Sequence, residues 1–404
     1  MPAVSDLDLP EFDYTDQELR GQRYRAAMRE LEGRGDWLLT GPLGYVVVDR
    51  EAGEFFLRTK AAQFPGLKMA ELFGVRDGPL HREMTGNIIN VNGDDHRRLR
   101  NLINPALAPR ATDAHRPAMR GFLEELLAVL PPDGRCEFVE AFAKPYPSLT
   151  IAHVLGAPLE DAPRLHHWSN WIQRQFDAAS LMNERERIEQ ACVEAYAYLD
   201  GLLAARRADP GEDVISALLA AEDEGDRLSA QEVVDLVLDL ILGGIDTVQS
   251  QLSHTVRLLA EHPDQWAALR ERPGELAGPA VEEALRYEPV TPFTARIVVE
   301  PIDYRDVTFP AGTIVMVSAW HGNRGGESDP DTFDIAAERS GRILTFGAGI
   351  HYCVGANLAR AELQEGLAFL ARNVERIELD GEPGFGTITG IYGLDSLPVR
   401  FTLA

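Results

Sequence analysis

The chain has 404 residues, of which 45% are apolar and 25% charged, the composition of an ordinary globular protein. Its 64 acidic and 39 basic residues give a net charge of −25, which disfavours binding to nucleic acids because their phosphates are repelled. The three cysteines, Cys136, Cys192 and Cys353, form no CxxC pair, which excludes a disulfide scaffold and a zinc ribbon.

The chain shows no sign of secretion or of membrane insertion. Residues 1–19 are rich in Asp and Glu and contain no Lys or Arg, whereas a signal peptide needs a basic start. The most apolar helix-length stretch, Val233 to Ile245, is interrupted by Asp235 and Asp239 and is too short to span a bilayer. We therefore expect a cytoplasmic protein without a membrane partner.

The helical pattern of the chain predicts its fold class. Helical periodicity dominates residues 95–290, with an apolar stripe at Leu123, Leu126, Leu127 and Leu130. Strand-like runs beside Gly or Pro lie at 44–48, 296–299 and 313–317. These patterns predict a mainly α fold with a small β component. We expect one domain over residues 1–404, with its N-terminal and late segments richer in strand.

One helix is predicted to be much longer than the others. Ser229-Ala-Gln-Glu232 has the form of a capping box, and no helix breaker follows until Pro263. Such a helix has about 30 residues and extends roughly 45 Å, at 1.5 Å per residue. A helix of that length must cross most of the molecule.

The densest motif surrounds the last cysteine and reads F-G-A-G-I-H-Y-C-V-G at residues 346–355. A helical pattern begins just after Cys353, and a thiolate before a helix N-terminus has a lowered pKa. The glycines let the backbone approach closely. Such a thiolate serves either as a nucleophile or as a metal ligand. The glycines argue against a buried structural cysteine, which is our interpretation of Cys136 and Cys192.

This motif, followed by Leu358-Ala359-Arg360, resembles the haem-ligand signature of the cytochrome P-450 haem-thiolate monooxygenases. The resemblance implies a triangular helical prism with a long central helix and minor sheets. It also implies a haem b whose iron takes its axial thiolate from Cys353, an arrangement that favours O–O cleavage. Phe346 would then shield the thiolate, with His351 and Gly355 completing the cofactor loop.

A second motif, Glu283-Ala-Leu-Arg286, resembles the Glu-x-x-Arg of the family's K helix. By themselves, Glu and Arg at i and i+3 are a routine surface pair worth tenths of a kcal/mol. The resemblance implies a third member, an Arg shortly before the cysteine loop. Arg339 is our choice, and Arg342 is the alternative.

Three basic residues match positions that bind the haem propionates in this family. His96 and Arg100 lie in a motif that resembles the family's C helix, and Arg296 occupies another propionate-binding position. Arginine suits this role because its planar guanidinium pairs with a carboxylate through two hydrogen bonds. The cluster around His96 also fits a solvated helix start. Ile343 stands where the family often has a further propionate-binding His.

Within the long helix, Gly243-Gly244-Ile-Asp246-Thr247 resembles the family's oxygen-activation motif. Each interior glycine costs roughly 1 kcal/mol relative to Ala, so a close helix crossing or a functional groove must offset it. The resemblance implies that Thr247 holds a water or the bound oxygen and that Asp246 relays protons. This pair favours oxygen activation over the alternative function, a haem-based gas sensor or carrier without turnover.

The family resemblance also implies partners and a substrate class. Electrons would come from a separate ferredoxin and ferredoxin reductase, docking on a basic patch formed by Arg97, Arg98 and Arg110. We expect a monomer that hydroxylates a mainly apolar small molecule of terpenoid, steroid, fatty acid or polyketide type. A cysteine hydrolase is disfavoured because no GxSxG or Cys–His signature occurs.

The substrate pocket is assigned by position in the chain. Residues 160–208 are expected to form a mobile lid, in which His166 and His167 are partly exposed. The expected pocket residues lie in 69–90, in 168–182 and at Val290, Phe293, Ile391 and Tyr392.

Asp239 is an unusual residue on the long helix. It shares a face with Gly243 and Thr247, and a buried carboxylate there is costly unless it is paired or protonated. Either an internal partner satisfies Asp239, or it receives an amine or hydroxyl of the substrate.

Overall fold

The computed structural model describes residues 1–223, 228–339 and 341–404, and most of them are helical. The α-helices are α1 (Gly21–Arg34), α2 (Arg50–Arg58), α3 (Gly66–Leu72), α4 (Gly78–Gly86), α5 (Gly93–Ile103), α6 (Pro109–Ala128), α7 (Pro145–Leu155), α8 (Ala162–Gln173), α9 (Ala178–Asn183), α10 (Arg185–Ala208), α11 (Val214–Asp223), α12 (Ala230–Gly244), α13 (Asp246–Glu261), α14 (Pro263–Glu271), α15 (Pro273–Tyr287), α16 (Ala319–Arg324) and α17 (Ala356–Asn373). None of the helices in these described ranges is long and apolar enough to cross a membrane.

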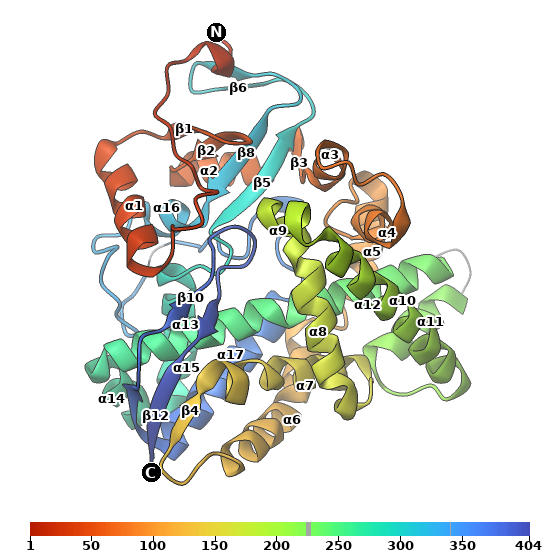
Figure 1. Ribbon diagram of the computed structural model, residues 1–404, viewed down its shortest axis with the longest axis vertical. Helices are drawn as coiled ribbons and strands as arrows, with labels where there is room; N and C mark the ends of the chain where they lie inside the picture. Colours follow the sequence, from red (N-terminus) through yellow and green to blue (C-terminus); the bar gives the residue numbers. More distant parts are fainter. Residues whose placement is uncertain (224–227, 340) are drawn as a thin grey trace.

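The strands form small sheets at the edges of the helical body (Figure 1). They are β1 (Leu38–Gly41), β2 (Gly44–Val47), β3 (Ala62–Gln63), β4 (Arg135–Glu137), β5 (Phe293–Val298), β6 (Ile302–Tyr304), β7 (Val307–Phe309), β8 (Ile314–Ser318), β9 (Val374–Leu379), β10 (Gly384–Phe385), β11 (Leu394–Ser396) and β12 (Pro398–Leu403). The largest sheet has the order β1-β2-β8-β5-β3, and only its β2–β8 pair is parallel. The mainly α fold with a small β component is therefore confirmed.

The predicted long helix is present but is interrupted once. Ser229 and Glu232 form the expected capping box at its start. Helix α12 then ends at Gly244 and α13 begins at Asp246, because Ile245 departs from helical geometry, with φ −97° and ψ −70°. The sequence has no helix breaker before Pro263, so the expected unbroken helix was wrong at this one position. The two segments still continue in line through the middle of the molecule (Figure 1).

The main hydrophobic core surrounds these two central helices. Ile241 of α12 and Leu252 of α13 are each 1% exposed and belong to one cluster with Leu367 of α17. Burying one such side chain contributes roughly 1.5–3 kcal/mol. A second cluster, which includes Phe56 and Val317, joins α2 to the largest sheet. The central helices are therefore held rigidly, and side chains on them have fixed positions.

One carboxylate lies in this core without a counter-charge. Glu362 of α17 is fully buried, and neither of its carboxylate oxygens has a hydrogen-bond partner among the described residues. The neighbouring Thr150 hydroxyl donates to the Tyr146 carbonyl instead. Burial raises the pKa of Glu362 well above its ordinary value. Burial therefore favours the neutral form of this carboxyl in the folded protein.

This predicts a pH-dependent stability that Glu362→Gln should remove. A raised folded pKa favours the folded state fully below the ordinary pKa of Glu, and this contribution is lost as pH rises, by up to about 1.4 kcal/mol per pH unit. The thermal midpoint of Glu362→Gln, relative to the parent, should therefore increase between pH 5 and 8. As a control, Glu365→Gln breaks the ion pairs with Arg116 and Arg120 and should destabilise the fold at neutral pH. Parallel pH profiles for the parent and Glu362→Gln would contradict the assignment.

Candidate active site

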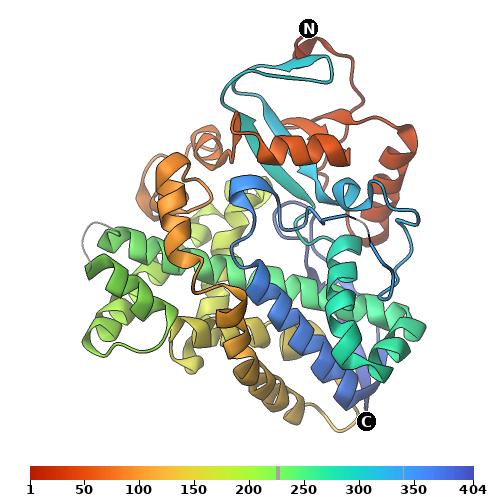
Figure 2. The same cartoon turned by 180° about the vertical axis from the view of Figure 1, so that it is seen from behind.

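The cysteine loop is folded tightly enough that several of its positions require glycine. The Cys353 N–H donates to the Phe346 carbonyl (2.9 Å), and the Gly347 N–H donates to the Leu344 carbonyl (2.8 Å). Gly347 and Gly349 have φ values of 69° and 73°, which other residues rarely adopt. A Cβ on Gly349 would also lie 2.6 Å from the Leu57 carbonyl oxygen. The loop leads directly into α17, as Figure 2 shows from the back of the molecule.

The electrostatics of Cys353 differ from the sequence-based expectation. The N–H groups of Gly355 and Ala356 and the guanidinium groups of Arg100 and Arg360 all favour the thiolate. Burial outweighs them and raises the pKa of the thiol, so a lowered pKa was the wrong expectation for the chain alone. A coordinating metal deprotonates a thiol outright, so this environment is consistent with a metal ligand and disfavours a free nucleophile.

Four basic side chains gather around this cysteine. The rings of His96 and His351 lie 4.6 Å apart, and Arg100 interacts electrostatically with both His351 and Cys353. Burial, followed by the nearby Arg296, His96 and Arg100, lowers the pKa of His351 to about 3. The structure thus brings together the predicted residues His96, Arg100, Arg296, His351 and Cys353.

Arg296 is a buried cation without a counter-charge. It is 2% exposed, and its guanidinium makes one hydrogen bond within the described chain, to the neighbouring Ala295 carbonyl. Burial lowers its pKa to about 10. An unpaired buried charge is costly, so the site requires an anion beside Arg296.

The residues present therefore fit a haem. Its propionates would pair with Arg296, Arg100 and His96, and its iron would take the sulfur of Cys353. Within the described ranges, no group of three or more His, Cys, Asp or Glu side chains could hold a metal ion by itself. Ile343, in place of a family His, packs against the main core.

Asn92 is a member of this site that the sequence analysis missed. The His351 Nε2–H donates to Asn92 Oδ1 (3.4 Å), which ties the cysteine loop to the start of α5. Asn92 precedes α5 as its N-cap residue, so its polar character resembled an ordinary cap signal. Phe346 also has an unforeseen neighbour, because the Arg360 guanidinium lies 4.4 Å from the centre of its ring.

Glu283, Arg286 and Arg339 form a buried ion triad. Arg286 donates to both carboxylate oxygens of Glu283 (2.7 and 2.8 Å), and Arg339 does the same (3.1 and 2.6 Å). Burial alone would raise the pKa of Glu283, but the two guanidinium groups lower it. The third member is thus Arg339 rather than Arg342. The triad anchors α15 to the segment that precedes the cysteine loop.

The two glycines of the central helix have different roles. A Cβ on Gly244 would lie 2.3 Å from Cδ1 of Ile151, so a close helix crossing with α7 requires this glycine. A Cβ on Gly243 would meet nothing within 4 Å, so Gly243 borders open space. The Thr247 hydroxyl donates to the Gly243 carbonyl (2.7 Å) and faces the same space. Gly243 and Thr247 therefore form the groove, whereas Gly244 serves packing.

Asp246 lies next to the groove but points toward α8. Its carboxylate accepts hydrogen bonds from the Ser169 hydroxyl (2.6 Å) and from Asn170 Nδ2 (3.5 Å). His166 Nε2 lies 4.0 Å from the same carboxylate. His166 is therefore part of this site, although the sequence analysis expected only a partly exposed residue of the lid. Burial raises the pKa of Asp246, and these neighbours oppose the increase. Asp246 is therefore suited to exchange protons.

Two of the predicted pocket residues do not face the site. Tyr392 is fully buried in a cluster with Tyr24, and its hydroxyl accepts a hydrogen bond from the Gly21 N–H (3.2 Å). Phe293 packs against Phe12 and Tyr14. Side chains alternate along a strand, so Phe293 and Arg296 of β5 point to opposite faces, and proximity in sequence misled the prediction.

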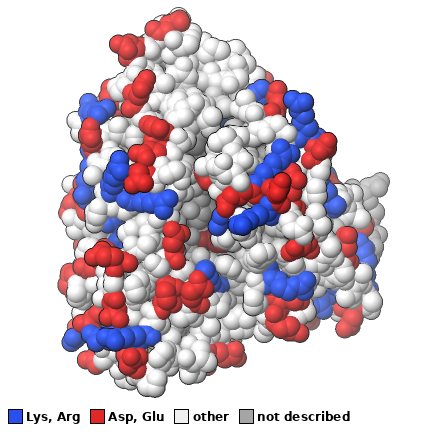
Figure 3. All heavy atoms as spheres, viewed as in Figure 1, with Lys and Arg blue, Asp and Glu red and all other residues white. Residues whose placement is uncertain are grey.

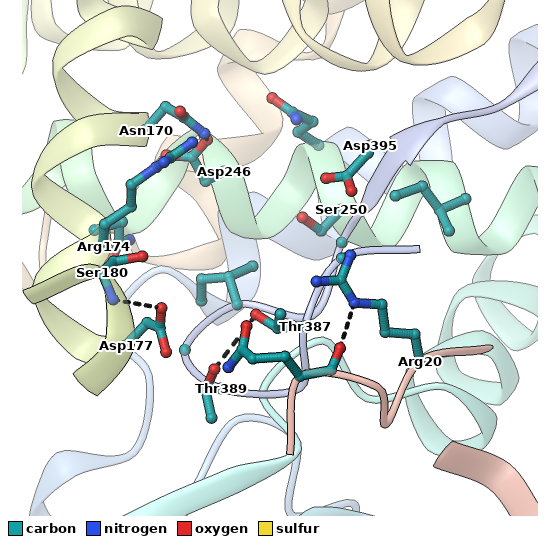
Figure 4. A pocket seen from close by; sticks show the side chains of 18 residues that line it. Arg20, Asn170, Arg174, Asp177, Ser180, Asp246, Ser250, Thr387, Thr389 and Asp395 are labelled. Atoms are coloured by element: carbon teal, nitrogen blue, oxygen red, sulfur yellow. Dashed lines mark hydrogen bonds between the residues drawn. The ribbon is translucent and has the colours of Figure 1, made fainter. Parts of the chain in front are cut away.

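The other pocket candidates are Val290, Ile391 and Asp239. Val290 is buried, and its carbonyl accepts a hydrogen bond from the Tyr392 N–H (2.8 Å). Ile391 lines a polar cavity of about 300 Å³ that extends to Asp246 (Figure 4). Asp239 has an internal partner, because its Oδ2 accepts a hydrogen bond from the Ile88 N–H (2.9 Å). Burial raises the pKa of Asp239 well above its ordinary value, and the Ile88 N–H opposes this effect.

A glycine-rich cysteine loop beside the unpaired buried cation Arg296, together with an open groove at Gly243 in the central helix, is the arrangement expected of a haem-thiolate protein. A family model, Cytochrome P450, matches residues 59–272 and 275–382. The chain is 33% identical over 405 residues to luteothin monooxygenase of Streptomyces thioluteus, covering 98% of this chain and 97% of that protein. The chain belongs to the cytochrome P450 family and is a monooxygenase with a haem-thiolate cofactor.

Solved structures agree with this assignment. The crystal structure of CalO2 superposes with a TM-score of 0.90 at 30% identity, covering 98% of this chain and 99% of that chain. The structure of P450BioI in complex with an acyl carrier protein ligated to hexadec-9Z-enoic acid superposes with a TM-score of 0.85 at 30% identity, covering 93% of this chain and 98% of that chain.

Replacing the three cysteines one at a time tests the ligand assignment. The reduced, CO-bound parent should show the red-shifted Soret band of thiolate ligation, and Cys353→Ser should lose this band. Cys136→Ser and Cys192→Ser should keep it, because neither lies in the cysteine loop. Retention of the thiolate band in Cys353→Ser would show that the ligand is another residue.

Proposed function

We propose that this monooxygenase hydroxylates a mainly apolar small molecule, using O₂ and electrons from separate redox proteins. The observation that carries the proposal is the position of Thr247 and Asp246 beside the open groove at Gly243, together with Cys353 and its cations. When bound, the haem supplies the oxygen-activating iron. NADPH-dependent formation of a hydroxylated product, with ferredoxin and its reductase present, tests the proposal against a gas sensor or carrier, which would form no product.

The chain's own residues supply positioning and protons. Arg296, Arg100 and His96 would hold the propionates and thereby orient the cofactor beneath the groove. The hydroxyl of Thr247 would hold a water molecule at the groove, since it can exchange its bond to the Gly243 carbonyl for one to water. Asp246 would take up protons on its carboxylate oxygens and pass them toward Thr247.

The electron donor is a ferredoxin that docks beside the cysteine loop. Ile350 and Tyr352 are 52% and 40% exposed there, an apolar centre for an interface. Of the predicted basic patch, Arg110 is exposed and forms no ion pair within the described ranges, whereas Arg97 is exposed and pairs with Asp94. Arg58 and Lys60, which lie in no predicted motif, are also exposed and form no ion pairs in the part of the chain that the structure describes, and we add them to the patch. Arg98 instead pairs with Glu232 of α12. On the opposite face, acidic and basic side chains are interspersed (Figure 3). Local charge therefore favours docking on the cysteine side.

The substrate is an elongated apolar molecule of polyketide or fatty acid type. One relative acts on luteothin by its name, and a solved relative binds a fatty acid on an acyl carrier protein. Helices α8, α9 and α10 cover one side of the central helices α12 and α13 and would form the lid over the substrate pocket (Figure 1). Val290, Ile391 and Asp239 are the residues that we assign to the pocket.

Asp239 would orient this substrate through a polar group. Its Oδ2 is satisfied by the Ile88 N–H, whereas its Oδ1 has no hydrogen bond within the described ranges and the side chain is only half-buried. A hydroxyl or amine of the substrate would bond to Oδ1.

Thr247→Ala tests the role of the groove hydroxyl. The variant should still bind substrate and accept electrons, but product formed per NADPH should fall several-fold and hydrogen peroxide should rise. The reason is that the groove no longer holds a proton donor next to the site of oxygen reduction. Thr247→Ser keeps the hydroxyl and should retain most of the coupling. Equal coupling in the parent and Thr247→Ala would assign this role to another group.

Asp239→Leu tests the polar contact. Loss of a charge-assisted hydrogen bond costs roughly 1.5–3 kcal/mol, so a ligand with a charged amine should bind about ten- to hundredfold more weakly, and a ligand with a hydroxyl should be weakened less. Asp239→Asn keeps an acceptor for the Ile88 N–H and therefore serves as the control for the segment that contains Ile88. A purely apolar ligand should bind the parent and both variants alike. If every ligand of a mixed panel binds Asp239→Leu as well as the parent, Asp239 serves only the fold.

A further inference from the structure

One face of α8 carries a polar stripe that the proposed function does not explain. His166, Ser169, Asn170 and Gln173 lie at i, i+3, i+4 and i+7, so they share one face of the helix. That face packs against α12, which is largely apolar. Polar side chains on such a contact are costly unless they have specific partners.

All four stripe residues bond to the broken turn of the central helix or to the residues beside it. Ser169 donates to Asp246 Oδ2 (2.6 Å), and Asn170 donates to Asp246 Oδ1 (3.5 Å). The His166 Nε2–H donates to Gln249 Oε1 (2.8 Å), one turn beyond Asp246.

Gln173 stabilises the break itself. In an unbroken helix, the Leu242 carbonyl would accept a hydrogen bond from the Asp246 N–H, four residues later. Because α12 ends at Gly244, this carbonyl needs another donor. Gln173 Nε2 supplies it, at 2.5 Å. The side chain of Gln173 thus replaces the lost helical bond.

The polar cavity provides a path from this turn to the surface. Asn170, Gln173, Asp246 and Gln249 line its inner end, and Figure 4 shows Asn170 and Asp246 side by side there. Its other lining residues come from α13, from α9 and the turn before it, from β11 and the connection that precedes it, and from the N-terminal segment, and include Arg20, Asp177, Ser180, Thr387, Thr389 and Asp395. A cavity of about 300 Å³ with this lining has room for several hydrogen-bonded waters.

We propose that Ser169 and Gln173 are positioning residues for proton delivery, and that the polar cavity is the route by which solvent protons reach Asp246. Ser169 holds the carboxylate toward the cavity, where it takes a proton from water. Gln173 keeps the turn open, so the groove at Gly243 persists. The proton then leaves Asp246 for the groove, and the carboxylate is protonated again from the cavity. Besides the stripe, Arg174 is the charged group that faces Asp246. The proposal rests on the monooxygenase function stated above.

Ser169→Ala and Gln173→Leu test the proposal, with Ser148→Ala as the matched control. Ser148 is buried like Ser169, but its hydroxyl donates to the Lys144 carbonyl, and the residue neither lines the cavity nor bonds to Asp246. In both test variants, product per NADPH should fall about five- to tenfold and the solvent isotope effect on turnover should increase. Substrate affinity and the thiolate Soret band should stay those of the parent. Ser169→Thr keeps the hydroxyl and should restore coupling.

A second measurement does not depend on turnover. Infrared H/D difference spectra of the resting protein should contain a carboxyl band that Asp246→Asn removes. Its titration midpoint should move up by about one pH unit in Ser169→Ala and stay unchanged in Ser148→Ala, because the Ser169 hydroxyl favours the carboxylate. Unchanged coupling, isotope effect and midpoint in Ser169→Ala would overturn the proposal. A parent that forms no product would instead overturn the proposed function, while the infrared result would still stand.

Discussion

The structure depends on a helix that crosses the whole core and is broken at one residue. Continuous packing on both sides of Ile245 fixes α12 and α13, so the break cannot relax by moving either segment. The cost of the lost helical bond is offset by a side chain from α8 rather than by solvent. As a result, an opening in the backbone is kept inside an otherwise well-packed core, beside the residues that exchange protons.

The cysteine side of the molecule is organised by charge. Arg296 is buried without an anion, whereas Glu283 is buried between two cations. The charges around Glu283 are balanced within the chain, and this ion triad fixes the segment that leads to Cys353. The charge of Arg296 is balanced only when an anionic cofactor is bound, and for this reason a buried guanidinium can be tolerated there. An ion cluster that is balanced within the chain thus belongs to the scaffold, whereas an unpaired buried cation marks a binding site.

Sequence reasoning succeeded where function depends on local spacing. The cysteine loop, the Glu283 and Arg286 pair, and the capping box at Ser229 are short-range patterns with one physical explanation each. It failed for Tyr392 and Phe293, because the direction of a side chain depends on strand register and on packing against distant aromatic residues.

The polar stripe of α8 was also overlooked, although its spacing is visible in the sequence. Nothing local shows that α8 packs against a break in another helix, so its polar residues looked like an exposed face. The pKa of Cys353 was misjudged for a similar reason, since burial of a thiol follows from the whole fold.

The contact between Gly244 and Ile151 has a consequence for the evolution of this chain. Because a Cβ at position 244 would overlap the end of the Ile151 side chain, an alanine there requires that side chain to rotate away or to become smaller. Substitutions at the two positions should therefore be correlated among descendants of this sequence. Position 243 faces open space and carries no such restriction, so adjacent glycines in one motif are subject to different selection.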